Sequence, residues 1–209
     1  MSLGSSLVMG FVWGSLAVVA SSLLLTAYLV QARAAGLLRP NYRGLYLPTA
    51  LGTGLLLPLL LLLYALYLLH GLAWRHFGAS AGALTLLTLG GLLDDLVSIA
   101  GADTAKGWRG HLGTWLRTGQ LTSGCWKLLF GGAAGALLAL SLEGGLTRRL
   151  LAFILITLGA NSGNQLDLRP GRTAKTVLVL LWGISGAVLI RDPGRWAGLL
   201  LGLGLTTAL

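Results

Sequence analysis

Long apolar runs separated by short polar segments are the main pattern along this chain. A membrane-spanning helix needs about 20 apolar residues, and most of the runs reach or approach that length. The last run holds only 14 residues, about 21 Å of helix, and falls short of a hydrocarbon core roughly 30 Å thick. The pattern predicts an all-α, polytopic transmembrane bundle of six to seven spans, at 7–30, 48–71, 78–95, 122–142, 150–167, 174–190 and 196–209.

The composition supports an integral membrane protein. The 209 residues are 55% hydrophobic and only 10% charged, whereas a soluble domain carries about twice that charged fraction. We therefore expect a single membrane domain over residues 1–209, located in the cell (plasma) membrane. The net charge of +9 suits anionic lipid head groups or phosphate-bearing substrates. Because the basic residues are spread over many short loops, we expect no nucleic-acid partner.

The basic residues also predict an orientation. The loops after the first, third and fifth predicted spans, together with Lys127, hold ten Lys and Arg residues, and the opposite loops hold five. The positive-inside rule places the richer set in the cytoplasm and the N-terminus outside. Asp94, Asp95 and Asp167 then all fall at cytoplasmic ends of predicted helices.

Asp94 and Asp95 stand side by side at the end of an apolar run, in a chain with only six acidic residues. On a helix they are about 100° apart, and adjacent carboxylates suit Mg²⁺, which prefers oxygen ligands. The alternative is a pair of solvated charges at a helix end. Negative charge at a helix C-terminus opposes the helix dipole, so we favour a functional role.

A second polar cluster, NSGNQLDLRPGR, ends the run at 150–167. Asn161, Asn164 and Asp167 have the spacing i, i+3, i+6 and share one face of a helix. They are candidates for binding a metal, a sugar or a nucleotide; the alternative is hydrogen bonding between helices. Arg169 and Arg172 follow, either as phosphate ligands or as cytoplasmic flanking charges.

Lys127 lies about one turn inside the fourth predicted span. It either snorkels to the surface or contacts a phosphate, and the nearby aspartates favour the phosphate. The preceding loop, KGWRGHLGTWLRTG, places Trp108, Leu112, Trp115 and Leu116 at near-helical spacing with basic residues between them. This spacing predicts a short amphipathic segment lying in the membrane interface.

Glycines four residues apart predict close packing of helices in lipid. Examples are Gly10 with Gly14, Gly131 with Gly135, and Gly198 with Gly202. The same spacing permits a homodimer without requiring one.

Four of these features together resemble a known family. The GLLDD helix end, the lysine early in the next span, the NxxNxxD helix end and the first cytoplasmic loop, NYRGLYLPTALG, are similar to the polyprenyl-phosphate N-acetylhexosamine-1-phosphate transferases. That superfamily includes the phospho-N-acetylmuramoyl-pentapeptide translocases. The resemblance runs from about residue 30 to residue 175 in matching order. The family's later cytoplasmic loops have no counterpart, so we expect a short, divergent member lacking a C-terminal part.

The resemblance implies a membrane glycosyltransferase of cell-envelope biogenesis. A UDP-amino sugar gives its sugar-1-phosphate to polyprenyl phosphate and UMP is released, with Mg²⁺, or Mn²⁺ in its place, bridging the diphosphate. The implied partners are polyprenyl phosphate, a UDP-sugar and membrane lipids. The implied roles are catalytic for Asp94, Asp95 and Lys127, metal-binding for Asp167, and substrate-binding for Asn161, Asn164, Arg169 and Arg172.

Two other functions compete with this one. A catalytically inactive relative would bind lipid-linked precursors or act as a scaffold in cell-envelope synthesis; the missing loops favour it. A transporter or channel would carry its acids near the middle of the membrane, whereas these acids lie at helix ends.

Overall fold

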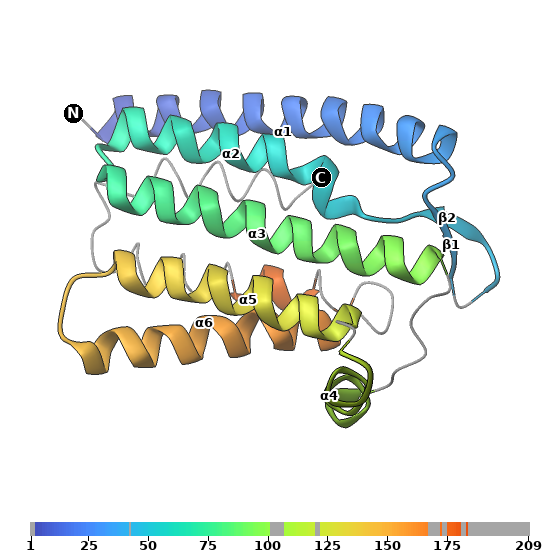
Figure 1. Ribbon diagram of the computed structural model, residues 1–209. Helices are drawn as coiled ribbons and strands as arrows, with labels where there is room; N and C mark the ends of the chain where they lie inside the picture. Colours follow the sequence, from blue (N-terminus) through green and yellow to red (C-terminus); the bar gives the residue numbers. More distant parts are fainter. Residues whose placement is uncertain are drawn as a thin grey trace. The chain divides into compact units, whose positions relative to one another are not determined.

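The chain is mostly helical in a computed structural model, which confirms the all-α class. Its elements, in order, are α1 (Leu3–Ala34), β1 (Leu38–Pro40), β2 (Tyr46–Pro48), α2 (Leu51–His70), α3 (Trp74–Ile99), α4 (Gly107–Thr118), α5 (Ser123–Ser141) and α6 (Leu146–Leu166). Figure 1 shows their arrangement. The structure describes residues 3–41, 43–100, 107–119, 122–166, 172, 175–180 and 183.

Two helices in the described part are long and apolar enough to cross a membrane, Trp74–Val97 and Ser123–Ser141. Two shorter apolar helices, Val19–Ala34 and Leu51–Ala65, accompany them. Each of the first five predicted runs contains a helix, since a helix pairs the backbone N–H and C=O groups of an apolar segment within the segment itself. The number of spans stays a prediction, and most of the runs at 174–190 and 196–209 lies outside the described residues.

The chain divides into two compact units, Leu24–Asn161 and Met1–Leu23 with Ser162–Leu209. The first unit holds both strands, α2 to α5 and most of α6. Of the second unit, the structure describes the start of α1, the end of α6 and a helical stretch at 175–180. The single membrane domain stays a prediction.

Within the first unit, α3 packs against α2 on one side and α5 on the other (Figure 1). Glycines allow the close approach. A Cβ added to Gly90 on α3 would lie 3.0 Å from the Cβ of Phe130 on α5, and one added to Gly135 would lie 2.5 Å from the hydroxyl of Thr157 on α6. Gly131 has nothing within 4 Å. Small residues therefore set the helix packing. Of the predicted pair Gly131 and Gly135, only Gly135 lies at a close contact between helices.

The distribution of apolar side chains is the reverse of a soluble domain. The hydrophobic residues buried in the described part are alanines, and large side chains on α2, α3, α5 and α6 are exposed, with Leu128 at 68% and Leu155 at 70%. Soluble monomers rarely leave contiguous apolar patches of this kind open to water. These exposed apolar faces support an association with a membrane.

α4 is helical over the loop for which the sequence predicts an amphipathic segment, and it runs across the bundle. It contacts α5, and Figure 1 shows it end-on while α3 and α5 extend across the view. Trp115 and Leu116 are exposed, Leu116 at 71%. The side chains of Trp108 and Leu112 lie outside the described part. The position of α4 in a membrane interface stays a prediction.

A short β-hairpin between α1 and α2 was not predicted. β1 and β2 pair antiparallel, with Leu38 opposite Pro48. Asn41 closes the hairpin, because its side-chain oxygen accepts hydrogen bonds from the backbone N–H groups of Arg43 (2.8 Å) and Leu45 (3.0 Å). Asparagine commonly stabilises turns in this way. Strands of three residues are too short to show an alternating pattern in the sequence.

Candidate functional site

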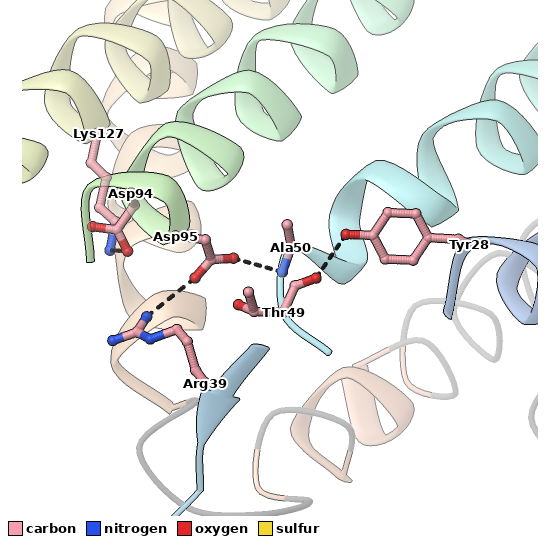
Figure 2. Close-up of polar contacts among 7 residues, drawn as sticks. All are labelled: Tyr28, Arg39, Thr49, Ala50, Asp94, Asp95 and Lys127. Atoms are coloured by element: carbon pink, nitrogen blue, oxygen red, sulfur yellow. Dashed lines mark hydrogen bonds and ion pairs between the residues drawn. The ribbon is translucent and has the colours of Figure 1, made fainter. Parts of the chain in front are cut away.

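Asp94 and Asp95 lie in the last two turns of α3, and each contacts a different neighbouring element (Figure 2). Asp94 faces α5, and Asp95 faces the hairpin and the start of α2. This divergence follows from their separation of about 100° around the helix. The structure therefore brings three of the predicted site residues, Asp94, Asp95 and Lys127, to one end of the first unit.

Lys127 forms an ion pair with Asp94. Its ammonium nitrogen lies 2.7 Å from Asp94 Oδ2, and the two side chains are 36% and 24% exposed. The close packing of Gly90 against Phe130 brings α3 and α5 together near this pair. A charge-assisted contact of this length is among the stronger polar interactions in proteins. Snorkelling alone therefore does not describe Lys127, which is directed at a carboxylate.

Asp95 has both carboxylate oxygens engaged. Oδ1 lies 3.2 Å from the Arg39 guanidinium on β1, and Oδ2 accepts a hydrogen bond of 2.8 Å from the backbone N–H of Ala50. Ala50 precedes α2 and no side chain caps that helix from within it. A carboxylate at a helix N-terminus is stabilised by the helix dipole and satisfies an otherwise unpaired donor. Asp95 thus caps α2 from another helix.

The segment that Asp95 holds is fixed from its other side by α1. The Tyr28 hydroxyl donates to the carbonyl of Thr49 at 2.7 Å. Thr53 donates to the carbonyl of Ala50, and Gly54 leaves room for the Tyr28 ring, since an added Cβ would lie 2.8 Å from it. Tyr28, Arg39 and Thr49 thus belong to the site environment. Sequence reasoning missed them as individual residues, although Arg39 and Thr49 lie in or beside the first-loop motif.

The second polar cluster is only partly described. Asn161 is exposed on α6, and Arg172 is exposed. Asn164 lies within α6, but its side chain, and Asp167 and Arg169 entirely, lie outside the described residues. Whether Asp167 meets Asp94 and Asp95 therefore stays a prediction.

Whether this end of the unit can hold a divalent cation depends on which carboxylate oxygens of Asp94 and Asp95 have no partner in the protein. Among the described residues, no three His, Cys, Asp or Glu side chains group closely enough to hold a metal ion. Carboxylate oxygens are nevertheless the donors that Mg²⁺ prefers. Asp94 uses one oxygen for Lys127 and offers the other, whereas Asp95 uses both within the protein. In the described part of the chain, these carboxylates therefore leave one oxygen, on Asp94, without a protein partner, and one oxygen does not by itself form a metal site.

The opposite end of the first unit carries a different set of residues. Arg75 pairs with Glu143, and His76 Nδ1 lies 3.5 Å from Ser141 Oγ. Nearby, Tyr67 packs edge-on against Trp74, with ring centroids 5.9 Å apart. The acid among these residues, Glu143, stands without a neighbouring acid in the sequence, unlike Asp94 and Asp95.

Comparison with protein families, with characterised proteins and with solved structures gives no match to this chain. The functional assignment therefore depends on the motifs and their arrangement in space.

Proposed function

We propose that this chain is a membrane phosphoglycosyl transferase that moves a sugar-1-phosphate from a UDP-amino sugar to polyprenyl phosphate. The observation that carries the proposal is the Lys127–Asp94 ion pair of 2.7 Å beside Asp95. A lysine and two carboxylates gathered at one helix end are groups that phosphate and divalent-cation chemistry can use. The resemblance at the sequence level supports the same reaction.

The proposal places the bundle across the plasma membrane, with the aspartate end in the cytoplasm. α3 carries no charged residue between Arg75 and Asp94, a length of roughly 28 Å that nearly matches the hydrocarbon core. Tyr67 and Trp74 lie at the far end, where aromatic residues commonly mark a membrane interface. The exposed apolar faces of the helices then meet lipid, which removes the cost of exposing them to water.

Each residue of the site then has a task. Lys127 holds a substrate phosphate, and Asp94 supplies a carboxylate oxygen next to it. Asp167 is the metal ligand that the resemblance indicates, and Asn161, Asn164, Arg169 and Arg172 belong to substrate binding. When bound, Mg²⁺ would offset negative charge on the diphosphate and on the phosphorus under attack.

Turnover by the purified full chain tests the proposal. With Mg²⁺, polyprenyl phosphate and a panel of labelled UDP-sugars, we expect a lipid-linked product and release of UMP. Asp94→Asn and Asp167→Asn should each lower the rate by about 100-fold or more, whereas Glu143→Gln at the opposite end should not. A rate unaffected by either aspartate change would contradict the site assignment.

A catalytically inactive, precursor-binding relative is the second candidate. The observation that favours it is that both aspartates already have partners within the protein, Asp94 through Lys127 and Asp95 through Arg39 and Ala50. This candidate predicts saturable binding of polyprenyl phosphate, insensitive to chelation by EDTA, and no product from any UDP-sugar donor.

A further inference from the structure

We infer that Asp95 is a positioning residue, which clamps the start of α2 and the β-hairpin onto the end of α3 and leaves the chemistry to Asp94 and Lys127. The inference rests on the proposed function, because it divides the roles of two aspartates in that site. The contacts of Arg39, Asp95 and the Ala50 N–H are called the Asp95 clamp below.

Both oxygens of the Asp95 carboxylate already have partners within the protein. Its two oxygens contact Arg39 at 3.2 Å and the Ala50 N–H at 2.8 Å, and the side chain is 23% exposed. To ligate a metal or take a proton from a substrate, it would have to release one of these partners. Leaving a partly buried donor unpaired is costly. Asp94 has no such constraint on its second oxygen among the described residues.

A second observation is the geometry of Ala50. Its backbone is left-handed, with φ 56° and ψ 36°, and no side chain of its own segment caps α2. A non-glycine residue in this conformation persists only where its surroundings hold it. The Asp95 carboxylate supplies one restraint, and Tyr28, through the carbonyl of Thr49, supplies the other. The segment Pro48–Ala50 is therefore held between α1 and α3.

The Asp95 clamp also affects the position of Asp94. Asp94 and Asp95 are neighbours on α3, so any movement of the end of α3 after loss of the clamp would also displace Asp94 relative to Lys127 on α5. Displacements of about 1 Å at a reacting centre can lower a rate by about 100-fold. The clamp thus acts on the reaction through the position of Asp94, without contact to the reacting atoms.

A double-mutant cycle on turnover tests this division. Asp95→Asn and Arg39→Met should each lower kcat by about 10- to 100-fold, the effect of losing one charge-assisted contact. The double variant should be no slower than the slower single variant, because the two residues form one clamp. Arg39→Lys, which keeps the charge, should restore most of the rate. The opposite result would be a loss of kcat greater than this range in Asp95→Asn, which Arg39→Met increases further by its own factor in the double variant. That result would show that Asp95 takes part in the chemistry.

Hydrogen exchange of the Ala50 amide tests the clamp without any turnover. In the full chain in lipid nanodiscs, Asp95→Ala should speed this exchange by about tenfold or more, since the amide loses its acceptor. Asp94→Asn is the matched control one residue away, and it should leave the Ala50 amide unchanged. Unaltered exchange in Asp95→Ala would overturn the inference.

The two readouts separate the inference from the proposed function. If the wild-type chain gives no lipid-linked product, the transferase proposal fails, while the exchange of the Ala50 amide still decides whether the clamp exists. If product forms and Asp95→Asn abolishes it with unchanged Ala50 exchange, the transferase stands and the positioning role of Asp95 is wrong.

Discussion

The two ends of the Leu24–Asn161 unit both carry ionic groups, but they use them differently. At one end, Asp94 and Asp95 are 24% and 23% exposed and draw partners from α5, β1 and the start of α2. At the other, Glu143 is 77% exposed and has Arg75 as its one ion-pair partner among the residues that the structure describes. The surroundings of a charge, more than its presence, therefore indicate a site.

Physical chemistry explains why the two ends should respond differently to mutation. An exposed ion pair contributes little, because water solvates either partner once the other is lost. A partly buried charge that loses its partner is left without that solvation, and the protein is destabilised by the uncompensated group. The predictions below use matched residues from the two ends.

Replacing the lysine of one pair and the arginine of the other should give the largest contrast. Lys127→Met removes the cation beside Asp94, and we expect turnover to fall by about 100-fold or more, as for other groups that stabilise developing charge. Arg75→Met removes the cation beside Glu143 and should change turnover by about twofold or less. The measurement is kcat/KM for the lipid-linked product. Equal losses in the two variants would remove the distinction between the two ends.

Truncating an acid at each end should separate their contributions to stability. Asp95→Ala leaves the Ala50 N–H and the Arg39 guanidinium unpaired, and we expect a loss of about 2 kcal/mol in unfolding free energy. Glu143→Ala should stay within about 0.5 kcal/mol of the wild type. Denaturant unfolding of both variants in the same detergent measures the difference. A loss at Glu143 as large as that at Asp95 would contradict the assigned roles.

The sequence predicts the long helices of this unit and groups Lys127 with the aspartates, but it predicts a phosphate contact for Lys127; it predicts neither the ion pair with Asp94 nor the Asp95 clamp. Long apolar runs specify helices directly, and the predicted topology put both residues at one membrane face. The clamp depends on the backbone N–H of Ala50, and a backbone donor leaves no trace in residue type. In the sequence, Arg39 is one of the ten Lys and Arg residues of the predicted cytoplasmic side, because nothing local links it to Asp95, 56 positions later.

The neighbouring glycines of α3 offer a matched test of packing near the aspartate end. Gly90 faces Phe130 at 3.0 Å from a built Cβ, whereas Gly91 has open space around it. Gly90→Ala should destabilise the protein by about 1–2 kcal/mol because α3 and α5 must separate. Gly91→Ala should be neutral or stabilise by up to about 1 kcal/mol through helix propensity. Thermal unfolding distinguishes them, and the same response at both positions would show that Gly90 does not set the approach.

The smallest effect concerns α4, which lies across the bundle at the aspartate end. If α4 rests in the membrane interface, the 71% exposed Leu116 side chain dips into the acyl boundary while Arg117 reaches the head groups. A polarity-sensitive probe on Leu116→Cys, in a Cys125→Ser background, should shift to the blue on transfer from buffer to vesicles containing anionic lipid, because it enters a less polar environment. A probe on Arg117→Cys should shift less. Equal shifts at both positions would indicate that α4 has no membrane-facing side, and the difference between the two ends would then rest on the aspartates alone.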